Sequence, residues 1–189
     1  MKYRTIVADP PWEYEAHPRG PSSFGRLSRH ELPYQQMTLE EIGRLPIGDM
    51  ADKDAHLWLW TTNRYLPSAF GLVTAWGFTY KQTMVWRKTG CPTPFAASFA
   101  PNHAEYLLFC VRGKLPLSSR LKTNVVEAPQ QRAHSLKPDV FLDMVESVSP
   151  GPYLEDVRTA ATPRLGHLGV TSASRLTHCR HSSPHAPAG

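Results

Sequence analysis

The sequence predicts a doubly wound α/β domain, with a mostly parallel sheet and helices on both of its faces. Three apolar segments rich in β-branched and aromatic residues, 3–8, 56–60 and 78–86, have the length and composition of buried strands. Helical patterns at 38–45 and 66–76 alternate with them, and this order of elements is typical of α/β folds. The 189 residues suffice for one such domain and are too few for two of ordinary size.

The first strand ends at the most informative residue of the chain. Tyr3–Ala8 contains no Gly or Pro and stops abruptly at Asp9, which is followed by Pro10, Pro11 and Trp12. Ligands of open α/β sheets bind beyond the carboxyl ends of the strands, so this carboxylate is expected at a binding edge. The prolines have a fixed φ and no N–H, which predicts a stiff turn with two free carbonyls.

The turn suits a particular chemical group. A carboxylate and a carbonyl provide two acceptors for the two N–H groups of a nucleobase amine, and Trp12 provides a flat wall on which the ring can stack. The alternative is a rigid turn after an edge strand, with Trp12 buried beneath it.

The elements that follow have recognisable ends. Thr38 and Glu41 form a predicted capping box, and Pro46 ends that helix. The second strand runs into Asn63, which is either a site residue or a cap of the helix that ends at Gly77.

Bulk composition restricts the class of protein. The net charge of +5 and the pI of about 9.2 favour a polyanionic partner, although a modest excess of arginine is common. Three widely spaced cysteines (Cys91, Cys110 and Cys179) suit free thiols in a reducing cytoplasm and form no metal pattern. We expect a cytoplasmic protein without a signal peptide or a membrane span.

Four segments resemble a known family in the same order along the chain. These are Ile6–Trp12, Pro33–Met37, Arg132–Pro138, and Asn102–Glu105, which is one residue shorter than the Asn-His-x-x-Glu pattern that it resembles. Together they are similar to the MT-A70 family of N(6)-adenine methyltransferases, over residues 3–155. The resemblance implies a Rossmann-like class I methyltransferase fold of permuted order, with the catalytic strand first and the cofactor strand last. It also implies S-adenosylmethionine as the cofactor.

The resemblance implies a role for each residue of the site. The catalytic turn comprises Asp9, Pro10, Pro11 and Trp12, and the cofactor residues are Asp9, His134, Ser135 and Lys137. Residues toward the acceptor are Trp12, Tyr34, Asn102 and Glu105, and Asn63 is added because it follows the carboxyl end of a strand. Lys137 also stands beside a predicted helix with Pro138 at its first position, a good carboxylate site, although a lysine flanking a capped helix is common. The alternative interpretation of Glu105 is that it forms a surface ion pair and has no role in the site.

The resemblance stops sharply after Glu155. From Val157 onward the sequence has no acidic, aromatic, isoleucine or lysine residue, so 1–155 is predicted as the methyltransferase domain and 156–189 as a disordered or frame-altered tail. Codons for Leu165–Gly169, read one base later, give the Trp-x-x-Trp-Gly ending of the family. We hypothesise a shifted reading frame near Glu155. Resequencing the gene tests this, and an intact frame without recoverable Leu-Phe-x-Arg codons would contradict it.

The implied reaction is methyl transfer from S-adenosylmethionine to the N(6) amine of adenine in nucleic acid. DNA is favoured over RNA, because a small chain without an added RNA-binding module resembles a bacterial or phage enzyme. Two alternatives stay open: a non-catalytic member that binds nucleic acid or a partner methyltransferase, and an enzyme for RNA or cytosine. A homodimer or heterodimer is also left open.

Overall fold

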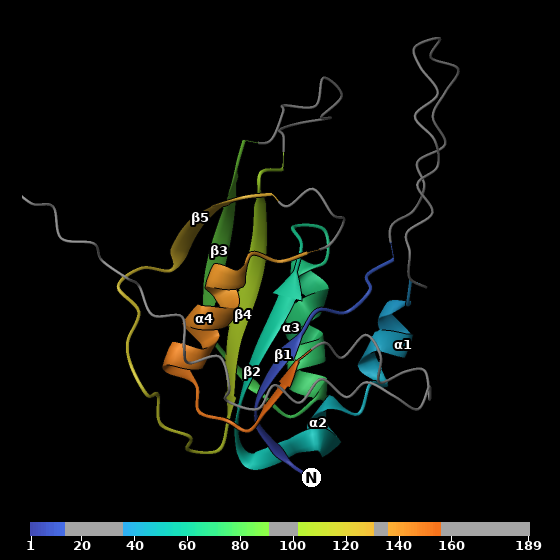
Figure 1. Cartoon of the computed structure of the whole chain (residues 1–189). Coiled ribbons are helices and arrows are strands. Elements are labelled where there is room, and N and C mark those ends of the chain that lie inside the picture. Colours follow the sequence, from blue (N-terminus) through green and yellow to red (C-terminus); the bar gives the residue numbers. More distant parts are fainter. Residues whose placement is uncertain (14–35, 91–101, 131–135, 156–189) are drawn as a thin grey trace, which may run out of the picture.

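The computed structural model describes residues 1–13, 36–90, 102–130 and 136–155, which form a six-stranded sheet between two groups of helices (Figure 1). Along the sheet the strand order is β5-β3-β4-β2-β1-β6. The strands are β1 (Tyr3–Ala8), β2 (Ala51–Thr61), β3 (Thr79–Thr89), β4 (Ala104–Arg112), β5 (Val125–Pro129) and β6 (Tyr153–Glu155). Of these six, β4 alone is antiparallel to its neighbours, which confirms the predicted mixed, mostly parallel sheet. The first strand lies beside the last, as the permuted order requires.

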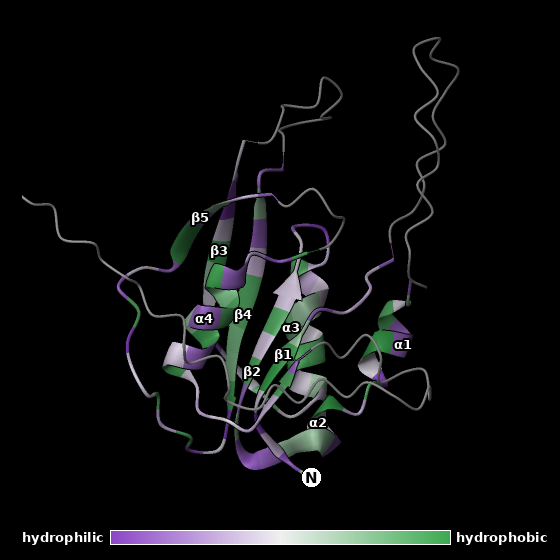
Figure 2. Cartoon of the chain, in the orientation of Figure 1, coloured by the Kyte–Doolittle hydropathy of each residue, from purple (hydrophilic) through white to green (hydrophobic). Residues whose placement is uncertain are grey.

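The described helices cover both faces of the sheet, as predicted. They are α1 (Leu39–Gly43), α2 (Ile47–Met50), α3 (Leu66–Ala75) and α4 (Asp139–Val148). The first three enclose one core with Leu57 and Leu59 of β2, while α4 encloses a second core with Trp58 and Trp60 of the same strand. Because the second half of β2 is buried on both faces, the sequence from Leu57 to Trp60 is an unbroken apolar run instead of an alternating one. Figure 2 shows green, hydrophobic segments on the strands at the centre of the sheet.

The structure confirms some predicted element ends and corrects others. Strand β2 begins at Ala51 instead of His56, and β3 ends at Thr89 instead of Trp86, because both strands continue beyond their apolar runs. The Thr38 capping box is present, and Gly77 follows α3 with a φ of 77°. The first helix ends at Gly43 with Arg44 as its C-cap, before Pro46 is reached, and Pro46 is instead the N-cap of α2. Pro138 is the N-cap of α4 and not its first helical residue, because its ψ of 137° is extended and the helical backbone begins at Asp139.

Two further findings concern the bulk predictions. Cys110 is a buried free thiol, and burial raises its pKa to about 12, so it is inert as a nucleophile at neutral pH. Cys91 and Cys179 lie outside the described residues. In the ranges that the structure describes, no helix has the length and apolar character needed to cross a membrane.

A fully buried histidine joins β2 to the end of α4. His56 Nε2 lies 3.1 Å from the Leu115 carbonyl, which can only accept, so this nitrogen carries the proton. Nδ1 therefore accepts from the Ser149 hydroxyl at 2.9 Å, and the Ser149 oxygen accepts from Trp58 Nε1, also at 2.9 Å. Every polar atom of this cluster is paired only while His56 is neutral.

The cluster predicts how stability depends on pH. Burial lowers the pKa of His56 below its ordinary value, although the Leu115 carbonyl opposes the shift. Unfolded chains take up this proton near pH 6.5, whereas the folded protein resists it until lower pH. The free energy of unfolding should therefore decrease as the pH falls below about 6.5, and level off below the pKa of the folded state.

Urea unfolding at several pH values measures this dependence, with His56→Gln as the comparison. A glutamine side chain offers an NH₂ group that donates and a carbonyl oxygen that accepts, but it does not titrate, so the variant should lose this part of the pH dependence. Parallel curves for the two proteins between about pH 5 and pH 7 would contradict the assignment of the slope to His56.

Candidate active site

Asp9 stands on a tight turn at the carboxyl end of β1. The Pro10 carbonyl accepts from the Trp12 N–H at 2.8 Å, and the Pro11 carbonyl accepts from the Met37 N–H at 2.9 Å. The prediction that both prolyl carbonyls are free is therefore wrong: each already accepts a backbone N–H. Since a carbonyl oxygen has two lone pairs, the Pro10 oxygen can accept one more hydrogen bond. The turn is thus fixed at both prolines before any ligand arrives.

The Trp12 side chain is buried at the end of this turn and is held there by its neighbours. Its side chain is only 4% exposed, and its ring stacks on Tyr65 with centroids 5.0 Å apart and an interplanar angle of 19°. Its Nε1 donates to the Trp60 carbonyl at 3.2 Å, while the Tyr65 hydroxyl donates to the Glu13 carbonyl. The sequence left two interpretations of Trp12 open, and the structure agrees with the one in which the ring is buried, with Tyr65 stacked on one of its faces.

A row of alternating charges crosses this edge of the sheet. Lys137 Nζ lies 2.9 Å from Glu105 Oε2 and 3.3 Å from Asp9 Oδ2. On the far side of Glu105, Lys88 Nζ lies 2.6 Å from Oε1. The row therefore takes one residue each from the end of β1, the segment before α4, the start of β4 and the end of β3.

The environment keeps the inner members of the row charged. Burial by itself would lower the pKa of Lys137, but the carboxylates of Asp9 and Glu105 outweigh it and raise that pKa. For Glu105, burial opposes ionisation, yet the ammonium groups of Lys137 and Lys88 leave its pKa lowered. Lys137 also stands 5.1 Å from the centroid of the Trp60 ring, a favourable position for a cation.

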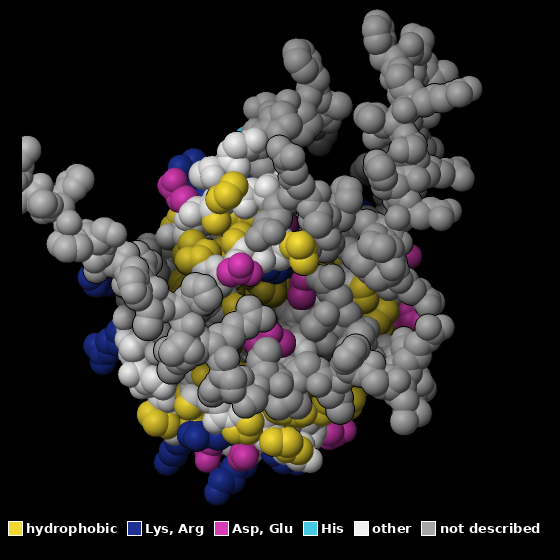
Figure 3. All heavy atoms as spheres, viewed as in Figure 1, with side chains coloured by type: hydrophobic (Ala, Val, Ile, Leu, Met, Phe, Trp, Pro, Cys, Tyr) yellow, Lys and Arg dark blue, Asp and Glu magenta, His cyan; other side chains and the backbone are white. Residues whose placement is uncertain are grey.

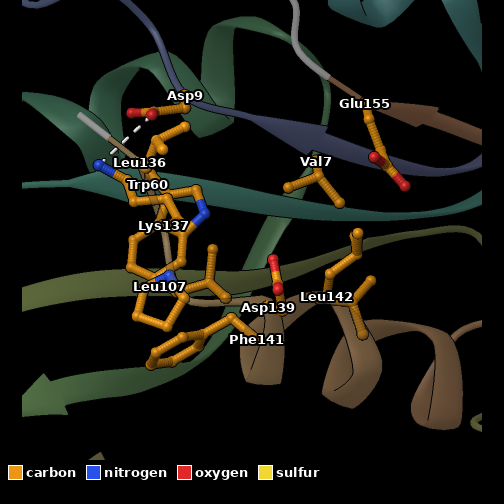
Figure 4. A pocket seen from close by; sticks show the side chains of 12 residues that line it. Val7, Asp9, Trp60, Leu107, Leu136, Lys137, Asp139, Phe141, Leu142 and Glu155 are labelled. Carbon is orange, nitrogen blue, oxygen red and sulfur yellow. Dashed lines mark ion pairs between the residues drawn. The ribbon is translucent and has the colours of Figure 1, made fainter. Parts of the chain in front are cut away.

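A pocket opens beside the row, between the sheet and the first turns of α4. Its volume is about 280 Å³, and its walls are largely apolar. The lining residues are Val7, Asp9, Trp60, Leu107, Leu136, Lys137, Pro138, Asp139, Phe141, Leu142, Val145 and Glu155. Figure 4 shows Asp9 and Lys137 together at one end and Glu155 at the other. On the face seen in Figure 3, carboxylates lie near the middle, while Lys and Arg side chains gather at the left and lower margins.

Two other predicted residues, Asn63 and Asn102, do not line this pocket. Asn63 is exposed after β2, and α3 begins at the N-cap Tyr65 without a side-chain cap, so Asn63 does not cap that helix. Asn102 is exposed, and its side-chain oxygen accepts from the Ala104 N–H. Tyr34, His134 and Ser135 lie outside the described residues.

Several residues of the site were not predicted. Trp60 and Phe141 form walls of the pocket, and Lys88 completes the charged row. The sequence shows Trp60 as part of an apolar strand and Phe141 as part of an amphipathic helix, and neither pattern distinguishes a pocket wall from ordinary core. Lys88 belongs to none of the sequence motifs described above, so nothing in the sequence indicates its role.

The sequence profile of the MT-A70 family matches residues 3–158 of this chain. The chain belongs to the MT-A70 family. This match includes the turn at Asp9, the charged row and the described residues that line the pocket.

Individual relatives of this MT-A70 protein share about a quarter of its residues. It is 28% identical over 163 residues to the type II methyltransferase M.MunI of a Mycoplasma species, covering 79% of this chain and 68% of that protein. It is 29% identical over 156 residues to the human N(6)-adenosine-methyltransferase catalytic subunit METTL3, and 27% identical to the Drosophila melanogaster MT-A70-like protein. The match covers 79% of this chain in both cases, but only 24% of METTL3 and 23% of the Drosophila protein.

Proposed function

We propose that this MT-A70 protein transfers a methyl group from S-adenosylmethionine to the N(6) amine of adenine in nucleic acid, with DNA as the favoured acceptor. The observation that carries the proposal is the position of Asp9, on a fixed turn at the mouth of a pocket and beside a charged lysine. Relatives named as N(6)-adenosine methyltransferases support the adenine amine as the acceptor group.

The pocket residues fit the proposed cofactor. S-adenosylmethionine carries a carboxylate, cationic groups and an apolar ring system, and its sulfonium supplies an activated methyl group. Lys137 offers a cation for the carboxylate, while Asp9 offers an anion at the same end of the pocket. Val7, Leu107 and other apolar side chains line the walls between this end and Glu155, where hydroxyl groups can be bound. His134 and Ser135 remain proposed cofactor residues on the strength of the family motif.

The acceptor amine is held by the turn. The Asp9 carboxylate and the second lone pair of the Pro10 carbonyl accept from its two N–H groups, which draws electron density onto nitrogen and directs its lone pair toward the methyl group. The rate is gained through orientation and electrostatics, without a covalent intermediate on the protein. A neutral amine attacks first and loses its proton afterwards, so Asp9 need not act as a base before transfer. In duplex DNA the base must first leave the stack, at a cost of a few kcal/mol.

Mass spectrometry of nucleosides tests the proposal directly. After incubation of the full chain with S-adenosylmethionine and DNA or RNA, we expect N(6)-methyladenine in the DNA digest and little in the RNA digest. N(6)-methyladenine in RNA alone would contradict the preference for DNA. Methylated cytosine, or no methylated nucleoside in either digest, would contradict the adenine reaction.

A second candidate function is that of a catalytically impaired binding or partner subunit. It is favoured by one observation, the departure from the family sequence after Glu155, where the family holds the nucleoside part of the cofactor. Calorimetric titration with S-adenosylmethionine separates the two. Micromolar binding, on the order of −8 kcal/mol, that is lost in Lys137→Ala supports the enzyme. Absence of binding in the wild-type chain supports the partner subunit.

A further inference from the structure

Glu105 lies at the centre of the charged row, although it does not line the pocket. Its two carboxylate oxygens contact two different lysines, Lys137 through Oε2 and Lys88 through Oε1. Its side chain is 15% exposed, so this is not the surface ion pair that the sequence offered as an alternative. A carboxylate this deeply placed needs its charge balanced, and the two ammonium groups do so.

The contacts of Lys137 show what Glu105 does for the site. The ammonium lies closer to Glu105, at 2.9 Å, than to Asp9, at 3.3 Å, and its side chain is 22% exposed. With Asp9 as its sole carboxylate, Lys137 would be free to move onto that residue. Glu105 draws the ammonium toward β4, and Lys88 prevents Glu105 from following Lys137 toward Asp9.

We propose that Glu105 is a positioning residue, which holds the Lys137 ammonium between two carboxylates and so fixes both Asp9 and the proposed anchor of the cofactor. This inference rests on the proposed function, because Asp9 and Lys137 belong to that site. Glu105 touches neither the acceptor amine nor the cofactor in this account and acts only through Lys137.

The charge state of Lys137 provides a signature of this role. Burial favours the neutral amine, and the negative charges of Asp9 and Glu105 keep it protonated. Replacing Glu105 by glutamine leaves Asp9 to oppose burial alone, so Lys137 should lose its proton at lower pH. Among the described residues, the other charged or titratable groups of this edge and pocket are Lys88, His103, Asp139 and Glu155, and the substitution leaves all of them in place.

The test is the pH dependence of kcat for the full chain and two variants. We expect Glu105→Gln to lower kcat about tenfold at neutral pH, and to lose further activity on the basic side at a lower pH than the wild type does. Glu105→Asp retains the charge with a shorter reach, so it should restore part of the activity on the basic side. Glu127→Gln serves as the matched control, because it removes a 2.6 Å ion pair with Arg87 at an exposed site outside the pocket.

Superimposable pH profiles of the wild type and Glu105→Gln would overturn the inference, and so would the same basic loss in Glu127→Gln. A second measurement does not depend on enzymatic activity. It is a double-mutant cycle with Glu105→Gln and Lys137→Met, in which urea unfolding gives the stability of each variant. We expect a coupling of about tenfold in the unfolding equilibrium constant. If the wild type methylates neither DNA nor RNA, the proposed function fails, and a cycle with no coupling then overturns the positioning role separately.

Discussion

Replacing Asp9 with asparagine should lower kcat by about 10² to 10³, the cost of losing one oriented electrostatic contact in an active site. Asparagine has the same shape and keeps one carbonyl acceptor, but it lacks the charge that strengthens the hydrogen bond to the amine. The fold should survive, because Lys137 still has Glu105 as a partner at 2.9 Å. Single-turnover methyl transfer measures the chemical step, and calorimetry measures cofactor binding independently.

Asp143→Asn is the matched control for this variant. It makes the same chemical change on the exposed side of α4, away from the pocket lining, and should leave kcat unaltered. An Asp9→Asn variant within about threefold of the wild type would contradict a catalytic Asp9, since the expected loss is far larger. Loss of cofactor binding with normal turnover at saturation would assign Asp9 to the cofactor instead of the acceptor.

Replacing Ser149 with alanine should lower the free energy of unfolding by about 3 kcal/mol, more than most single substitutions. The Ser149 hydroxyl accepts from Trp58 Nε1 and donates to His56 Nδ1, and its removal leaves two buried polar atoms without partners. Each such atom costs about 1 to 3 kcal/mol. Urea unfolding at a pH above the titration of His56 measures the loss without interference from protonation.

Ser147→Ala isolates the effect of burial. Ser147 also donates a hydrogen bond, to the Met144 carbonyl at 2.7 Å, but it is exposed on the same helix, and water can replace its contacts. We expect it to cost less than about 0.5 kcal/mol. Equal stabilities for the two variants would show that the His56 cluster contributes nothing to the fold.

The fold could be predicted because its signals are local. An apolar run predicts strand β2, the Thr38 capping box predicts the start of α1, and Gly77 predicts the end of α3. Asp9 could be predicted for the same reason, since a carboxylate that ends an apolar strand is visible in one short segment. These residues form their structures with neighbours in the chain, so a reading of the sequence needs no knowledge of the sheet.

The contacts of the site could not be predicted, because they depend on strand register. Lys88 and Glu105 meet only because β3 and β4 pair antiparallel, with Trp86 opposite Glu105. The stacking of Trp12 on Tyr65 likewise needs the end of β2 to lie beside the end of β1. His56 is read from sequence as a strand residue, and its role appears only once Ser149 lies against β2.

The reversed direction of β4 has a consequence for how relatives of this protein can diverge. Because β4 runs opposite to β3, the segment that joins them, residues 90–103, leaves and re-enters the sheet at the edge that carries Asp9 and Lys137. Antiparallel neighbours need no helical crossover between them, unlike parallel strands. Evolution can therefore lengthen, shorten or exchange this segment as a module, without rerouting a helix or moving β1. Under the proposed function, acceptor preference can drift at this edge of the sheet while the methyl-transfer chemistry is inherited unchanged.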